Sequence, residues 1–156
     1  MKKKIRPIPI EEFPNVNTNC LGFAIGSTKN INGINYFSLN HNFAIDEAFI
    51  KKIKSLGYTN IPRRIENLEE AKPNEYVFKV IGFKEKKDYF DSILELKACR
   101  KIFDFHVLRR ELDGTWVHKP GWFNPPCSIC EEDWAWIYES FGKKFVLFAL
   151  AAEEKE

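Results

Sequence analysis

The chain has 156 residues, of which 44% are hydrophobic and 15% aromatic, and this favours one folded domain rather than a disordered chain. Its 24 basic and 22 acidic side chains leave a net charge of +2, which argues against a polyanion binder, so we expect no nucleic-acid partner. No stretch approaches the roughly 18 apolar residues of a membrane span, so we expect no membrane partner either. The oligomeric state is left open.

The beginning of the chain carries charged residues but no apolar core of a secretory signal. We therefore expect a cytoplasmic protein or one released by a non-classical route, such as a delivered effector or a phage protein. Prolines punctuate residues 1–16, which predicts an extended arm along the domain. A short helix is expected over 19–26, ending at Gly26, and a loop with at most one short strand over 27–42.

The middle of the chain contains the clearest helical pattern, over 46–56, with Asp46 as its cap and Gly57 as its end. Residues 62–70 predict a loop or a second short helix, and a turn at 73–74 precedes a largely buried strand over 76–83. The remaining segments of this part are a charged connection over 84–88 and a stretch over 89–99 that fits helix and strand equally.

The last third of the chain predicts a hairpin made of residues 103–111 and 115–118. An aromatic and proline-rich loop follows, and then a helix, a last strand and a solvated tail, over 131–141, 144–150 and 153–156. The chain is thus expected to form a single α+β domain over residues 1–156, in which early helices pack on an antiparallel sheet.

Cys20 stands at the expected start of the first helix, in the stretch Asn19-Cys20-Leu21-Gly22-Phe23. The unsatisfied N–H groups and partial positive charge of a helix N-terminus favour thiolate over thiol. A cysteine nucleophile also needs an imidazole that takes and returns its proton. Two of the three histidines, His106 and His118, lie across the predicted hairpin, whereas His41 lies in a loop and carries no comparable signal.

The length of the hairpin turn decides whether His106 and His118 can share a site. A two-residue turn at 113–114 pairs Arg109 with His118 and sends the two imidazoles to opposite faces of the sheet. A three-residue turn, Leu112-Asp113-Gly114, pairs residue 108 with His118 and places both histidines on one face. The sequence permits the second arrangement, because Gly114 suits the left-handed position that such a turn requires.

Three blocks of the chain resemble NlpC/P60-type cysteine peptidases of the papain-like superfamily. The stretch around Cys20 resembles their Asp-Cys-Ser-Gly-Phe box, and residues 68–78, with Lys72-Pro73-Asn74-Glu75, are similar to their Leu-x-Pro-Gly-Asp-Leu-Val stretch. His106-Val107-Leu108, followed by Asp113-Gly114 and His118, looks like their His-Val-Gly-Ile-Tyr…Gly…His segment. The segment 115–121 looks more like a poorly described papain-like group with an Asn-Cys-x-x-Phe/Tyr-Ala box.

This resemblance implies a papain-like α+β fold and a thiol hydrolase, a cysteine peptidase or amidase, that cleaves an amide without a cofactor. Cys20 would be the nucleophile, His106 the general base and His118 the orienting residue, although the two histidines could exchange roles. The expected substrate is a peptide or protein, with the peptide of peptidoglycan as one candidate. Transglutaminase or deamidase chemistry on the same residues is an alternative, and so is a non-catalytic binding module with a buried Cys20. A small zinc-stabilised interaction domain is a third alternative.

Several further residues are weaker candidates for the site. Asn17 or Asn19 could donate a hydrogen bond to an oxyanion, and Trp116 and Trp122 could line a substrate cleft. The Cys127-Ser128-Ile129-Cys130 motif is half of a zinc site, but the sequence contains no second pair of cysteines. Cys99 and a histidine could complete such a site only as scattered parts. We therefore expect no metal, and two unpaired thiols in a loop.

Overall fold

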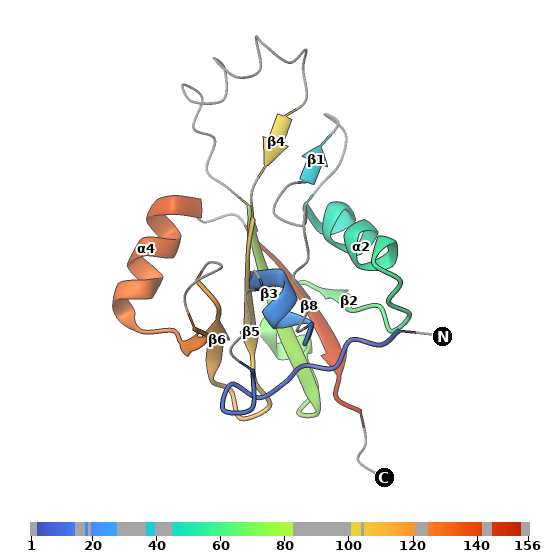
Figure 1. The fold of residues 1–156 in the computed structure, drawn as a ribbon, viewed down its shortest axis with the longest axis horizontal. Coiled ribbons are helices and arrows are strands. Elements are labelled where there is room, and N and C mark those ends of the chain that lie inside the picture. Colours follow the sequence, from blue (N-terminus) through green and yellow to red (C-terminus); the bar gives the residue numbers. More distant parts are fainter. Residues whose placement is uncertain are drawn as a thin grey trace.

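The protein is an α+β domain whose centre is a six-stranded antiparallel sheet (Figure 1). The computed structural model describes residues 3–14, 18, 20–27, 37–39, 45–82, 101–103, 105–120, 125–141 and 145–153. In spatial order, the strands of the sheet are β2 (Arg63–Ile65), β8 (Phe145–Ala151), β3 (Glu75–Gly82), β5 (Phe105–Arg110), β6 (Trp116–His118) and β7 (Cys127–Ser128). A separate two-stranded sheet pairs β1 (Phe37–Leu39) with β4 (Lys101–Phe103). The expected α+β class and antiparallel sheet are confirmed.

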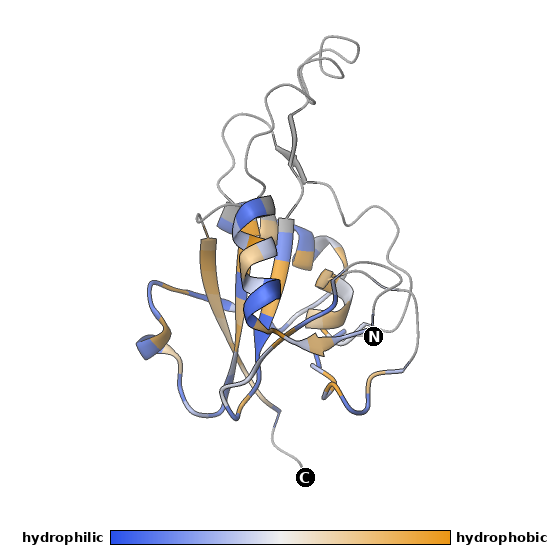
Figure 2. Cartoon of the chain, turned by 90° about the vertical axis from the view of Figure 1, so that its left-hand side faces the viewer, coloured by the Kyte–Doolittle hydropathy of each residue, from blue (hydrophilic) through white to orange (hydrophobic). Residues whose placement is uncertain are grey.

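Helices lie on both faces of the large sheet. The short α1 (Cys20–Ala24) and α2 (Ile45–Ser55) cover one face, and α4 (Glu131–Phe141) covers the other (Figures 1 and 2). A 3-10 turn, η1 (Leu68–Glu70), connects β2 to β3. Among the residues that the structure describes, no helix combines the length and apolar character needed to cross a membrane.

Strand alternation divides the core into two layers, because successive side chains of a strand point to opposite faces. Val80 and its cross-strand partner Val107 point toward α1 and α2, where they pack with Phe49 and Phe148. Leu108 points the other way, into a smaller cluster with residues of α4. The residues of β5 therefore contact α1 and α4 in turn, and each helix is held by its own set of apolar side chains.

Most of the expected elements are present, with small shifts at their ends. The helix over 131–141 and the strands near 76–83 and 144–150 are confirmed. The expected helix over 46–56 begins one residue earlier, so Asp46 lies inside its first turn, where its carboxylate accepts a hydrogen bond from the amide of Glu47. The segments 84–88 and 89–99 lie outside the described residues.

Two short strands replace expected loops. Residues 62–70 contain β2 as well as η1, and Cys127 lies in β7 rather than in a loop. Both strands lie at an edge of the sheet and have three residues or fewer. So short a strand shows no alternation of its own, and its pairing depends on the neighbouring strand, which is why the local pattern did not reveal it.

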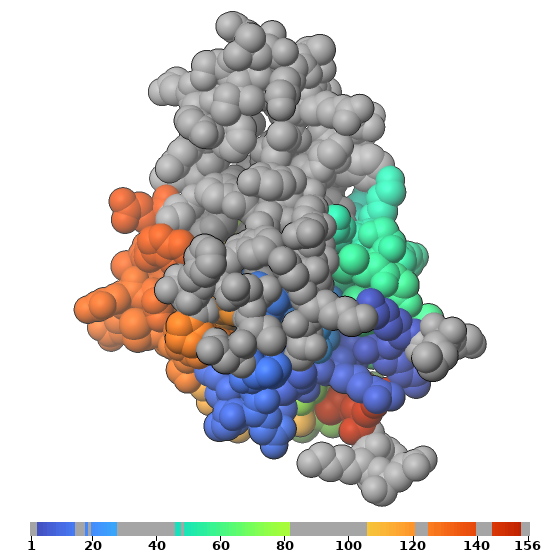
Figure 3. Space-filling model, viewed as in Figure 1, coloured from blue at the N-terminus to red at the C-terminus, as the bar shows by residue number. Residues whose placement is uncertain are grey.

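The N-terminal arm is extended, as expected, and it is fastened to the domain by backbone contacts. The side chain of Asn60 accepts a hydrogen bond from the Ile5 amide at 2.6 Å and donates one to the Ile5 carbonyl at 3.0 Å. Gly26 lies against the arm with a φ of +77°, and a Cβ there would meet the Arg6 carbonyl oxygen at 1.8 Å. The arm runs across the lower front of the molecule between α4 and α2 (Figure 3). At the other end of the chain, Glu153 forms an ion pair with Arg6 at 3.0 Å.

Arg109 of β5 connects three segments of the chain from within the core. Its side chain is fully buried, and its guanidinium donates to the carbonyls of Phe23 and Ala24 at the end of α1 and to that of Ile8 in the arm. Glu111 neutralises the charge with an ion pair of 2.6 Å. The last carbonyls of a helix have no partner within the helix, so Arg109 both caps α1 and holds it on β5.

Replacing Arg109 with methionine should therefore lower the free energy of unfolding by about 3 kcal/mol or more. The substitution leaves two buried carbonyls, the partly buried carbonyl of Ile8 and the Glu111 carboxylate without their partner. Arg110→Met is the matched control, because Arg110 is partly exposed on the same strand, and it should change stability by less than about 0.5 kcal/mol. Denaturant unfolding of both variants measures the difference, and equal effects would contradict this role of Arg109.

Candidate functional site

The turn between β5 and β6 has three residues. Arg110 pairs with Trp116, and the Glu111 amide donates to the Thr115 carbonyl at 2.8 Å, which leaves Leu112-Asp113-Gly114 as the loop. Gly114 has a φ of +93°, the left-handed conformation expected at the last position of such a loop. The three-residue alternative is therefore confirmed, and its register carries both histidines to the same face of the sheet.

His106 and His118 form a buried hydrogen-bonded pair on this face. Nε2 of His106 lies 2.9 Å from Nδ1 of His118, and the side chains are 3% and 0% exposed. Burial, and secondarily the neighbouring His118, lowers the pKa of His106 to about 3, and burial also lowers the pKa of His118. Both imidazoles are therefore neutral at neutral pH, and one ring must donate to the other.

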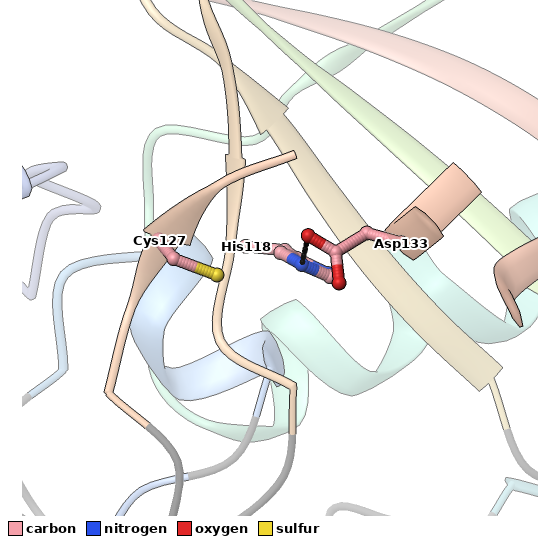
Figure 4. A group of neighbouring side chains, drawn as sticks. All are labelled: His118, Cys127 and Asp133. Atoms are coloured by element: carbon pink, nitrogen blue, oxygen red, sulfur yellow. Dashed lines mark ion pairs between the residues drawn. The ribbon is translucent and has the colours of Figure 1, made fainter. Parts of the chain in front are cut away.

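Two further side chains lie around the outer edge of His118 (Figure 4). Asp133, from the first turn of α4, has its Oδ2 3.7 Å from Nε2 of His118. Cys127 is the cross-strand partner of His118 in β7, so its side chain lies on the same face. His118 thus lies between the His106 ring on one side and the carboxylate and thiol on the other.

Asp133 is itself held in place by the start of α4. Its Oδ2 accepts hydrogen bonds from the Cys130 amide and the Cys130 thiol, both at 3.2 Å. The amide contact satisfies an N–H group at the helix start and orients the carboxylate toward β6. In the sequence, Asp133 had only the signal of an acidic residue in a first helical turn, and that does not reveal the contact with His118.

Cys20 is the first residue of α1, as expected, and it is buried at 9% exposure. It packs in the core cluster that contains Val107, on the face that α1 covers, whereas the side chain of the preceding residue, His106, points to the α4 face. It also lies within electrostatic reach of Lys119, the residue after His118, whose side chain is only 2% exposed. Burial lowers the pKa of Lys119 and the neighbouring Cys20 opposes that shift. The sequence did not single out Lys119 as part of the site.

Of the weaker candidates for the site, only Trp116 lies among the described residues. Asn17, Asn19 and Trp122 lie outside the described residues. Trp116 is partly buried on the histidine face, with its ring centroid 6.3 Å from that of Trp134 in α4. It lines a hollow together with Lys79, Phe145 and Leu147, so a position beside a cleft is compatible with its surroundings.

No family model, curated protein or solved structure gives a significant match to this chain. The assignment of a function therefore depends on the geometry of the site and on the chemistry of its residues.

The register of the histidine pair depends on the backbone at Gly114, and this can be tested directly. Gly114→Ala should lower the free energy of unfolding by about 1 kcal/mol, because a side chain disfavours a φ of +93°. Gly114→Asn should cost less, since asparagine adopts this conformation more readily. A Cβ at this position would meet no atom within 4 Å, so steric clash does not obscure the comparison. Equal losses for alanine and asparagine in denaturant unfolding would contradict the explanation.

Proposed function

We propose that the protein is a papain-like thiol hydrolase, a cysteine peptidase or amidase of the NlpC/P60 type, with Cys20 as its nucleophile. The observation that carries the proposal is the hydrogen bond between His106 and His118, with the Asp133 carboxylate beyond His118. Two buried neutral imidazoles in a row, followed by a carboxylate, form a path along which a proton can be held and returned.

The direction of the hydrogen bond determines which nitrogen of His106 acts as the base. When Nε2–H of His106 donates to Nδ1 of His118, the proton of His118 lies on Nε2, facing Asp133 at 3.7 Å. Nδ1 of His106 then keeps its lone pair for the proton of a thiol. His118 thereby holds the His106 ring in one tautomer, which is the orienting role.

The surroundings of Cys20 favour a negative charge on its sulfur. Cys20 is the first residue of α1, and Lys119 brings a cationic group within electrostatic reach. The paired positions of β5 and β6, Arg109↔Val117 and Arg110↔Trp116, lie next to the turn. The histidines lie beyond these pairs, at the end of the two strands against which α1 packs. The imidazoles point to the α4 face, with the His106 ring centroid 5.7 Å from that of Trp136, whereas α1 packs on the opposite face. We propose that the thiol reaches His106 around this end of β5.

The proposed reaction proceeds through an acyl-enzyme. The Cys20 sulfur attacks the carbonyl carbon of an amide while its proton passes to Nδ1 of His106. The imidazolium then protonates the leaving amine as the C–N bond breaks, which leaves a thioester on Cys20. Water, deprotonated by the neutral His106, hydrolyses the thioester and restores the thiol. An amine in place of water would make the same residues a transferase.

The proposed substrate is a peptide or protein that presents an amide to the end of the sheet. The hollow beside Trp116 lies on the histidine face and is lined by apolar and charged side chains, which suits a side chain of an extended peptide. The peptide of peptidoglycan belongs to this class.

Alkylation of the folded protein with iodoacetamide at pH 7 tests the nucleophile. Exposure alone predicts that Cys130, which is exposed, reacts before the buried Cys20. A thiolate at Cys20 would react faster than a thiol, so we expect the rate of labelling of Cys20 to exceed that of Cys130 by at least about tenfold. Peptide mapping by mass spectrometry gives the rate for each cysteine. If Cys20 reacts no faster than Cys99, Cys127 and Cys130, the proposal is wrong.

Two variants connect the reactivity of Cys20 with its proposed partners. His106→Gln keeps the size of the side chain but removes the base, and Lys119→Met removes the neighbouring charge. Each should slow the labelling of Cys20 by about tenfold or more. His41→Gln is the matched control and should leave the rate unchanged. Circular dichroism and denaturant unfolding confirm that each variant is folded before its rate is compared.

A further inference from the structure

The side chains around His118 present three metal-ligating atoms to one point. A ring nitrogen of His118, Sγ of Cys127 and a carboxylate oxygen of Asp133 all lie within 4.8 Å of one another. The ligands of a tetrahedral zinc lie about 3.3–3.8 Å apart, because Zn–N and Zn–O bonds measure about 2.0–2.2 Å and Zn–S bonds about 2.3 Å. A nitrogen and an oxygen ligand lie at the short end of this range, about 3.3–3.5 Å apart, so the 3.7 Å between Nε2 of His118 and Oδ2 of Asp133 needs to shorten by only a few tenths of an ångström.

One ring nitrogen of His118, Nε2, is buried without a hydrogen-bond partner among the described residues. Nε2 of His118 is completely buried and makes no hydrogen bond with any described residue, and the Asp133 oxygen at 3.7 Å is beyond hydrogen-bond distance. A buried polar atom without a partner costs free energy, and native proteins seldom leave one in that state. Figure 4 shows the ion pair of this nitrogen with the Asp133 carboxylate and the Cys127 sulfur directed toward His118, and a cation among these groups would satisfy the nitrogen.

From this geometry we propose a zinc site formed by His118, Cys127, Asp133 and Cys130. Cys130 is the proposed fourth ligand, because its sulfur lies 3.2 Å from Oδ2 of Asp133 and Cys130 is exposed at the start of α4. Its sulfur lies outside the group of three atoms within 4.8 Å of one another, so the side chain must move to replace the S–H···O hydrogen bond with a bond to the metal. The site thus uses the Cys-x-x-Cys motif, completed by a histidine and a carboxylate that only the fold brings near it.

The donor atoms favour zinc over other common cations. Thiolates and an imidazole suit zinc, whereas calcium and magnesium prefer oxygen ligands. On binding, each cysteine thiol releases one proton to solvent and becomes a thiolate, and the zinc ion keeps its oxidation state. The second nitrogen of a zinc-bound histidine usually donates to a neighbouring acceptor, and Nδ1 of His118 has such an acceptor in Nε2 of His106, 2.9 Å away.

The zinc site stands independently of the proposed hydrolysis, but the two use the same nitrogen in opposite ways. Hydrolysis needs the proton of His118 on Nε2, whereas zinc needs the lone pair there. Zinc therefore reverses the hydrogen bond between the histidines and moves the proton of His106 to Nδ1, the nitrogen proposed to face the thiol. A zinc-loaded protein would then be the inactive form of the enzyme.

Titration of the chelator-treated, reduced chain with zinc, in competition with a chromophoric chelator, tests the site. We expect one tightly bound zinc per chain. Cys127→Ser should weaken binding by more than about 100-fold, since even changes outside the ligand shell cost 10–100-fold. Cys99→Ser is the matched control, because it removes a thiol outside the proposed site, and it should bind zinc as the natural chain does.

Cobalt as a substitute for zinc identifies the ligands. The thiolate-to-cobalt absorption of the natural chain should fall by about half in Cys130→Ser, and Asp133→Asn should keep the band at lower affinity. Failure of the natural chain to retain zinc would overturn the site. So would equal retention by Cys127→Ser, or loss of binding in Cys99→Ser.

A separate experiment tests whether zinc binding lowers the reactivity of Cys20, and its result can be distinguished from failure of the zinc site or of the proposed hydrolase. One equivalent of zinc should slow the alkylation of Cys20 in the natural chain by about tenfold and should have no effect in Cys127→Ser. Tight zinc binding with unchanged Cys20 labelling would overturn the link and leave the metal site standing. Slow labelling of Cys20 even without zinc would refute the proposed nucleophile and would not affect the metal site.

Discussion

The register of the β5–β6 hairpin is the constraint on which the histidine site depends. An odd-numbered loop, made possible by the positive φ of Gly114, places His118 on the same face as His106 and opposite Cys127 in the next strand. A loop shorter by one residue would turn His118 to the other face and separate it from all three of its neighbours. The backbone conformation of Gly114 thus determines whether His118 can meet His106, Cys127 and Asp133.

Burial gives these groups their chemical character. The two buried imidazoles are neutral, so each ring carries one N–H group. Because a single hydrogen bond joins the rings, the tautomer of one ring determines the tautomer of the other. Whether Nε2 of His118 carries a proton therefore sets the direction of the hydrogen bond between the two rings. A proton there suits the proposed hydrolase, and a zinc ion there suits the proposed metal site. The same buried pair gives both proposals their physical basis and makes them mutually exclusive.

The local pattern of the sequence was sufficient for the longer elements. The helix over 131–141 has three acidic residues in its first turn, and the strands near 76–83 and 144–150 are long enough to show their apolar character. The edge strands β2 and β7 were missed, because strands of two or three residues exist only through their partner. The same reason hid Asp133 and Lys119, because the ion pair of Asp133 with His118 and the electrostatic interaction of Lys119 with Cys20 join separate parts of the chain.

The sequence by itself determined the α+β class, the helix that begins at Cys20 and the possibility that His106 and His118 share a face. These depend on backbone preferences and hydrophobic periodicity, which act over a few neighbouring residues. Only the tertiary structure decided that Arg109 caps α1, that α4 brings Asp133 to His118, and that both residues lie beside Cys127 of the Cys-x-x-Cys motif. Such contacts depend on which buried surfaces pack together across the whole chain, and no local pattern records that choice.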